Sequence, residues 1–229
     1  LDRIEEDVRA RSGRLAGRLR VWMPVLGTGV GIVRAIAAFS RAHPDIQVDL
    51  QQGRDPGALK PGEFDVAMQI GRAHNPELLI QKMFDVRMVL VASDAYAESW
   101  GLPTSVEDFP QHRSVLECDA RGRVVPWRLP DGTRVRPPPA AIRANGVGFV
   151  IGFALGGAGI ARVPDALAVP ALEDGHLLPV LPEVHTRDML SFVYLPDPSP
   201  TTRAFLDFMA ARNRARGRPV YDPTRPLWV

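Results

Sequence analysis

The strongest constraint on the fold is a strand, a helix and a second strand within the first 50 residues. Residues 17–24 form an apolar stretch that ends at Pro24, which has no N–H to donate to a sheet. A glycine-rich bend at 27–31 leads into residues 32–39, whose apolar side chains recur at helical spacing. Residues 46–50 alternate apolar and polar side chains, which is typical of a strand. This βαβ unit predicts two parallel strands joined by a right-handed crossover.

The rest of the chain continues to alternate strands and helices. Further strands are predicted at 64–70, 78–84, 87–92, 114–118, 141–144, 160–164, 177–181 and 190–195. Helices are predicted at 56–63, 149–155 and 201–213, with a helix start at Thr104 and Ser105 and a hairpin at 124–139 that turns at Asp131-Gly132. The strands at 87–92 and 190–195 bracket the second half. The pattern therefore predicts an α/β protein of two lobes with mixed sheets and a hinged ligand cleft between them.

The N-terminal 15 residues carry a different pattern. Leu1, Ile4, Val8, Arg11 and Leu15 follow alternating three- and four-residue steps, which is the seam of a short coiled coil that Arg11 interrupts. Two heptads are marginal by themselves, so this stretch is interpreted as the end of a longer dimerising helix. An amphipathic helix on the surface of the domain itself is the alternative.

Charge is distributed unevenly along the chain, and this distribution indicates whether the protein binds nucleic acid. The whole chain has a formal charge of +2, but residues 21–202 hold 16 basic and 20 acidic residues. The basic surplus lies at the two ends. A body with an acidic excess does not favour a nucleic-acid-binding face, which needs clustered Lys and Arg.

Cysteine content and the length of apolar runs limit the cellular compartments in which the protein is expected. The one cysteine, Cys118, excludes an intramolecular disulfide and favours a cytoplasmic protein. No apolar run approaches the roughly 20 residues of a membrane helix. The charged start does not look like a signal peptide. The chain begins with Leu1, which indicates a fragment of something longer.

Motifs for catalysis and for metal binding are absent from the sequence. There is no Gly-x-Ser-x-Gly, no Walker-type Gly-Lys-Ser/Thr and no His-Glu-x-x-His. The five histidines are scattered without metal-ligand spacing. Glu117 and Asp119 form an acidic pair two residues apart, but such a pair at a strand end is usually solvated. The expected protein is not an enzyme and has no metal or cofactor.

Ordered pieces along nearly the whole chain resemble the effector-binding (regulatory) domain of LysR-type transcriptional regulators, preceded by the end of their linker helix. No single piece is specific, but the ordered set at these spacings is. The matching pieces are 17–21, 38–39 with His43-Pro44 and Val48, Gly53, Leu59, Gly62 and 64–67, 89–93 with Tyr96, 157–164, 175–177 and 203–208.

The resemblance implies a two-lobed periplasmic-binding-protein-like (type 2) fold that holds a small effector in its cleft and forms a homodimer or homotetramer. It implies a linker-helix end at 1–16, a first lobe at 17–92 and 191–213, a second lobe at 93–190, and a tail at 214–229. In the family, dimer contacts use the helix at 31–42 and the strand at 46–50. DNA is bound by an N-terminal winged helix-turn-helix that this chain lacks.

Ligands of open parallel sheets lie beyond the carboxyl ends of the strands. The end of the first strand and the start of the next helix therefore contribute Pro24, Val25, Leu26, Thr28 and Gly29. The free N–H groups of that helix start favour an anion such as a carboxylate. In many family members a hydroxyl residue follows the first strand, whereas ungapped matching places Pro24 and Leu26 there. A less polar or aromatic effector therefore stays open beside a carboxylate or an amino-acid-like one.

Other strand and helix ends complete the predicted effector site: Gln69, Ile70 and Gly71, Glu117 and Cys118, Asn145 and Gly146, and Arg162. Each has a structural alternative. The glycines also suit tight turns, and Arg162 could reach solvent instead of an effector carboxylate. Cys118 could be a redox sensor or inert packing, of which apolar flanks favour packing.

Two other functions share this fold. A solute-binding protein for transport would need a secretion signal or a lipid anchor, and it would not explain the heptad seam. A dehydratase-like enzyme on the same scaffold would need a polar catalytic cluster in the cleft. The predicted function is effector sensing for a transcription factor.

Overall fold

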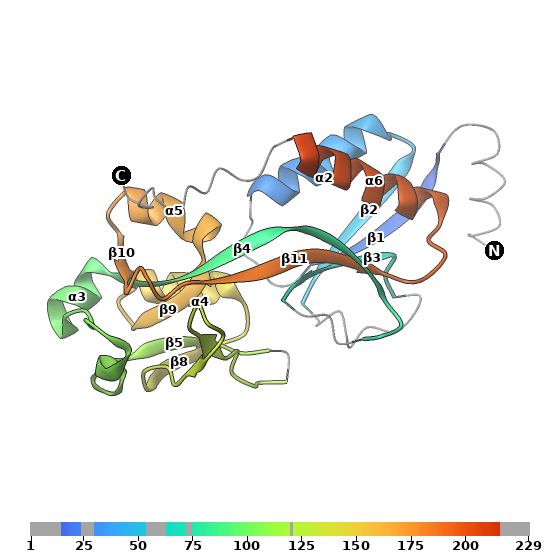
Figure 1. The fold of residues 1–229 in the computed structure, drawn as a ribbon. Coiled ribbons are helices and arrows are strands. Elements are labelled where there is room, and N and C mark those ends of the chain that lie inside the picture. Colours follow the sequence, from blue (N-terminus) through green and yellow to red (C-terminus); the bar gives the residue numbers. More distant parts are fainter. Residues whose placement is uncertain (1–14, 24–29, 54–62, 72–74, 120, 216–229) are drawn as a thin grey trace. The chain divides into compact units, whose positions relative to one another are not determined.

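The structure is a computed structural model that describes residues 15–23, 30–53, 63–71, 75–119 and 121–215 (Figure 1). These residues divide into two compact units. Unit 1 contains residues 15–23, 30–53, 63–71, 75–84 and 189–215, and unit 2 contains residues 85–119 and 121–188. Of the predicted linker-helix end at 1–16, helix at 56–63 and tail at 214–229, residues 1–14, 56–62 and 216–229 lie outside the described residues. Residues 15–16 are not helical, and residues 214–215 belong to the last helix.

Unit 1 contains the predicted βαβ unit. Its elements are β1 (Gly17–Met23), α2 (Val30–Ala42), β2 (Ile46–Gln52), β3 (Val66–Ile70), the first part of β4 (Leu79–Ser93), the later part of β11 (Thr186–Tyr194) and α6 (Pro200–Ala215). Strand order is β2-β1-β3-β11. β1 is parallel to β2 and to β3, and β11 is antiparallel to β3. The predicted parallel pairing of the first two strands is confirmed.

Aromatic side chains join the two helices of unit 1 to its sheet. Phe39 of α2 and Phe205 of α6 are completely buried, and their ring centroids lie 5.1 Å apart in an edge-to-face arrangement. Phe192 of β11 contacts Phe205 in the same manner at 5.6 Å. Figure 1 shows α2 and α6 together over the strands of this unit. The aromatic contacts therefore bind a C-terminal helix to the N-terminal βαβ unit, each by about 0.5–1.5 kcal/mol beyond its area burial.

Unit 2 holds the remaining elements. They are α3 (Asp94–Trp100), η2 (Val106–Gln111), β5 (Ser114–Glu117), β6 (Trp127–Arg128), β7 (Arg134–Val135), β8 (Ala140–Ala144), α4 (Val147–Leu155), β9 (Ile160–Pro164), α5 (Asp165–Glu173) and β10 (Leu177–Val180). β9 and β10 both pair antiparallel with β4, β5 is parallel to β9, and β8 is parallel to β5. β6 and β7 form the predicted hairpin around Trp127.

The sheet of unit 2 is covered on both faces, which follows from alternation along its strands. Val89 and Val91 of β4 pack into a cluster that includes α4 and α5 residues. Leu90 and Ala92 pack into a second cluster, with Tyr96 of α3 and the hairpin residue Trp127. Successive side chains of a strand point to opposite faces, so β4, β5, β9 and β10 each contribute to both clusters.

Three elements differ from the sequence-based prediction. The strands predicted at 78–84 and 87–92 are one strand, β4, which continues through the exposed Asp85. The helix expected after Ser105 is the 3-10 helix η2. Helix α5 was not identified from the sequence, because Pro164 and Pro170 both argue against a helix there; Pro164 is its N-cap and Pro170 lies inside it.

Gly159, just before β9, offers a test of the packing in unit 2. A Cβ there would lie 2.7 Å from the carbonyl oxygen of Arg113, which accepts a hydrogen bond from the Ile160 N–H. We expect Gly159→Ala to lower the free energy of unfolding by on the order of 1–3 kcal/mol. Thermal unfolding measures the change, at about 2–4 °C per kcal/mol for a chain of this size.

Gly152→Ala is the matched control. Gly152 lies in helix α4, where an added Cβ meets nothing within 4 Å. Alanine is the better helix former by about 0.5–1 kcal/mol, so this variant should unfold at the same temperature or higher. Equal losses in both variants would contradict the close approach at Gly159.

Candidate ligand-binding site

The predicted site residues fall into three groups in the structure. Pro24, Val25, Leu26, Thr28 and Gly29 lie outside the described residues. Gln69, Ile70 and Gly71 lie in unit 1, and Glu117, Cys118, Asn145, Gly146 and Arg162 lie in unit 2. The described site residues are therefore divided between the two units.

In unit 1, Gln69 and Ile70 are the last residues of β3, as predicted. They pair with Ser191 and Leu190 of β11. The N–H of Gly71 then donates to the carbonyl oxygen of Met189, with a distance of 2.9 Å. Gly71 has a φ of 85°, which a glycine adopts without strain, so its structural role is to turn the chain directly after the strand.

In unit 2, the ends of β5 and β8 bring four predicted residues together. Glu117 is the last residue of β5 and lies beside Ala144, the last residue of β8. The Cys118 N–H donates to the Ala144 carbonyl oxygen at 2.8 Å. Asn145 and Gly146 then lead directly into α4. Sequence reasoning therefore placed these strand ends correctly at one edge of the sheet.

The start of α4 has a glycine as its N-cap. Gly146 has a φ of 110°, and among the described residues no side chain caps this helix end. The Gly146 carbonyl oxygen accepts from the N–H groups of Phe149 and Val150. The N–H groups of a first turn have no partner within the helix and carry a partial positive charge, which favours an anion. Asn145 is exposed and does not cap the helix.

Cys118 is buried, with 7% of its surface exposed, and it is a free cysteine. It forms an isolated antiparallel bridge with Val124, opposite the side on which its N–H reaches Ala144. This placement agrees with the packing alternative.

Arg162 lies within β9, and 8% of its surface is exposed. The alternative in which it extends into solvent is therefore wrong. Its Nη2 donates to Thr186 Oγ1 at 2.6 Å and to Asp188 Oδ2 at 3.1 Å. Both acceptors belong to the first residues of β11. Thr186 and Asp188 were not predicted, because the strand was expected to begin at residue 190 and the polar run at 186–188 gives no local strand signal.

Glu117 is not solvated in the way that an acidic pair at a strand end usually is. Burial raises the pKa of its carboxyl above the ordinary value, while the positive charge of Arg162 partly opposes this effect. Within the described part of the chain, the Glu117 carboxyl forms no hydrogen bond. Asp119 behaves in the opposite way, because hydrogen bonds from the Arg123 and Arg121 N–H groups and the Arg123 side chain lower its pKa.

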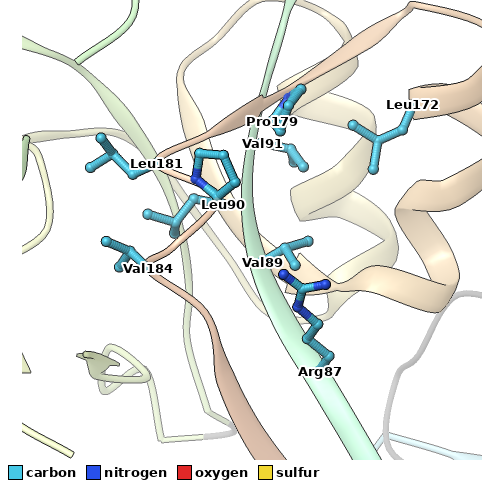
Figure 2. Close-up of a pocket in the computed structure, with 9 residues that line it drawn as sticks. Arg87, Val89, Leu90, Val91, Leu172, Pro179, Leu181 and Val184 are labelled. Carbon is cyan, nitrogen blue, oxygen red and sulfur yellow. The ribbon is translucent and has the colours of Figure 1, made fainter. Parts of the chain in front are cut away.

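A small cavity in unit 2 is a different feature (Figure 2). It lies beside β4 and is lined by Arg87, Val89, Leu90, Val91, Leu172, Pro179, Leu181, Pro182 and Val184. It leaves about 10 Å³ of room for solvent, which is close to one water molecule. Organic ligands occupy pockets of about 300–1,000 Å³, so this cavity is not a candidate effector site.

Metal-binding clusters and membrane-spanning helices are not found in the described ranges. Among the described residues, no group of three His, Cys, Asp or Glu side chains could hold a metal ion. Within the same ranges, no helix is long and apolar enough to cross a bilayer.

Known proteins share both the sequence pattern and the fold. Residues 12–214 match the family described as the LysR substrate binding domain. An HTH-type transcriptional regulator of Xanthomonas campestris is 28% identical over 222 residues, which are 93% of this chain and 64% of that protein. The chain therefore spans less than two thirds of the length of this relative.

Solved structures show the same fold. The regulatory domain of AphB from Vibrio vulnificus is 25% identical with a TM-score of 0.71, covering 85% of this chain and all of that one. The full-length structure of the Vibrio cholerae virulence activator AphB is 26% identical with a TM-score of 0.73, covering 91% of this chain and 75% of that one. These likenesses confirm the predicted α/β, periplasmic-binding-protein-like (type 2) fold.

The Glu117 carboxyl gives a pH-dependent prediction. A raised pKa in the folded state means that ionised Glu117 opposes folding, so its cost is absent at low pH and grows as pH rises above 4.5. We expect Glu117→Gln to unfold at a higher temperature than the wild type at pH 7, with the difference disappearing toward pH 4. Thermal unfolding across this range measures it.

Asp119→Asn is the control with the opposite sign. The lowered pKa of Asp119 means that its ionised form stabilises the fold, and this stability is lost as pH falls through the folded pKa. The Asn variant should therefore be the less stable protein at pH 7. If the Glu117→Gln and wild-type pH profiles run parallel, the burial of the Glu117 charge is contradicted.

Proposed function

The chain belongs to the LysR substrate binding domain family, and we propose that it is the sensor of a LysR-type transcriptional regulator. In this proposal a small effector binds the domain, and DNA is contacted by a winged helix-turn-helix outside this chain. The match over residues 12–214 carries the proposal. The HTH-type regulators among its relatives favour a sensing role over a catalytic one, and a cytoplasmic location.

The proposed lobes are 17–92 with 191–213 and 93–190, and strand and helix ends of each are proposed to contact the effector. Two features of unit 2 support an effector with an acceptor group, such as a carboxylate: the α4 start that no side chain caps, and the buried guanidinium of Arg162. Thr28 and Gly29 are proposed to supply the corresponding donors of the first lobe. A less polar or aromatic body agrees with the absence of a hydroxyl at Pro24 and Leu26, and an amino-acid-like effector stays open beside it.

A thermal-shift screen of small organic acids, aromatics and amino acids tests this function. A ligand at 100 times its Kd adds about 2.7 kcal/mol to the free energy of unfolding. We expect a hit to lose its shift in Thr28→Val, which removes the hydroxyl and keeps the side-chain volume. Thr133→Val, at an exposed hairpin position, is the matched control and should keep the shift. A hit whose shift survives Thr28→Val would contradict the placement, and turnover of a hit by the pure protein would contradict sensing.

The proposed assembly is a homodimer or homotetramer in which α2 and β2 form contacts. Exposed apolar side chains support self-association: Val33 of α2 is 42% exposed, Leu50 of β2 is 45% exposed and Phe149 of α4 is 62% exposed. Helix α4 contains no polar side chain, and a helix that is apolar all round is normally covered on all sides.

Val33→Ser tests the assembly. Because Val33 of α2 is 42% exposed, its replacement should change the unfolding temperature little and should shift the protein toward monomer in sedimentation equilibrium. Trp100→Ser, at the 49% exposed Trp100 of α3, is the matched control and should leave the association unchanged. Wild-type protein that sediments only as a monomer at high concentration would contradict the proposed dimer.

A further inference from the structure

Arg162 connects strands that are not adjacent in the sheet. It belongs to β9 and lies opposite Leu90 of β4. Its guanidinium bonds to Thr186 and Asp188 of β11, the strand on the other side of β4 in the strand order. The side chain therefore passes across β4 and fastens the start of β11 to β9.

Arg162 bonds to the part of β11 at which the chain passes from unit 2 to unit 1. Thr186 and Asp188 are the last part of unit 2, and the residues of β11 from Met189 onward belong to unit 1. The chain thus leaves unit 2 directly after the residue that Arg162 holds. Breaking the Arg162–Asp188 ion pair would therefore release β11 at the residue where the chain leaves unit 2.

The guanidinium uses only part of its hydrogen-bonding capacity. Both of its bonds are donated by Nη2. Among the described residues, Nε and Nη1 of Arg162 donate to no acceptor. A guanidinium carries five N–H donors and binds a carboxylate best through two of them at once. Arg162 therefore keeps the donors that a second carboxylate needs.

The acidic partner of Arg162, Asp188, is also bonded through only one of its carboxylate oxygens. Only Oδ2 of Asp188 is bonded to Arg162, and 34% of the Asp188 side chain is exposed, so the pair is open to solvent from that side. The charge of Arg162 also acts on the carboxyl of Glu117, which has no bonded partner within the described ranges. One buried cation thus faces two acids, of which it binds one through a single nitrogen.

We propose that Arg162 couples ligand binding to β11: a carboxylate-bearing ligand binds its unused N–H groups and weakens its hold on Asp188. This inference rests on the proposed sensing function and specifies it, because it names the anionic group of the effector and the strand that responds. Arg162 acts on β11 as a positioning residue. The anion competes because a guanidinium shared between two carboxylates attracts each of them less strongly.

Hydrogen exchange of the β11 amides, with acetate as the probe, tests the coupling. Acetate is small enough to reach any accessible guanidinium, and acetamide at equal concentration is its neutral counterpart, with chloride keeping the ionic strength constant. In the wild type we expect acetate to speed exchange of the peptide that begins at Thr186 several-fold, and acetamide to have no effect. An absent acetate effect in the wild type overturns the proposal.

Arg162→Lys is the diagnostic variant, since it keeps a cation for Asp188 and loses the second edge of the guanidinium. Its β11 amides should exchange faster than those of the wild type, and acetate should change them no further. Asp188→Asn keeps Arg162 and removes its competing charge, so its apparent acetate affinity should rise several-fold. Arg123→Lys, in the exposed pair with Asp119, is the matched control and should respond as the wild type.

Two outcomes separate this inference from the proposed function. If Arg162→Lys responds to acetate as the wild type does, Arg162 is not the anion-binding group and the inference is wrong. A hit from the ligand screen that binds Arg162→Lys with unchanged affinity would also contradict the inference, yet it would leave the sensing function intact. Loss of both the hit and the acetate response in Arg162→Lys, with its fold retained, supports the coupling.

Discussion

The buried Arg162 side chain is the central polar contact of unit 2. It lies in a sheet that is covered on both faces. Neighbouring residues of β9 contribute to two apolar clusters, and Arg162 occupies a position in that strand where only 8% of its surface remains exposed. Removing a guanidinium from water costs several kcal/mol unless acceptors replace the water. Thr186 and Asp188 are those acceptors, so electrostatics fixes the start of β11 in addition to backbone pairing.

Unit 1 is held by apolar and aromatic packing instead. Phe39 and Phe205 come from opposite ends of the chain, and their contact joins α2 to α6. A polar contact also joins two of its strands: Arg20 of β1 and Asp65, the residue before β3, bond through both their backbone and side-chain atoms. β4 and β11 contribute residues to both units, so an event in unit 2 that alters either strand acts on a segment that unit 1 also uses.

The predictable part of the fold consists of elements that carry their own local signal. The βαβ unit, the Asp131-Gly132 hairpin and helix α4 follow from periodicity and turn chemistry, and all are present. Helix α5 was missed because Pro170 outweighs a weak amphipathic pattern, although burial of Ala168 and Leu172 supports the helix. β4 was divided at Asp85 because a sequence does not show that this side chain lies on an exposed part of the strand.

For the candidate site, the sequence by itself determined which strand and helix ends gather, since parallel strands end at a common edge; Glu117, Cys118, Asn145 and Gly146 lie together for this reason. It also determined the family, through the order and spacing of short motifs. Only the tertiary structure decided that Arg162 is buried and bound to β11, and that Glu117 is desolvated. Burial and charge pairing depend on side chains that are 24 to 45 residues apart in the chain, and local patterns carry no information about such distances.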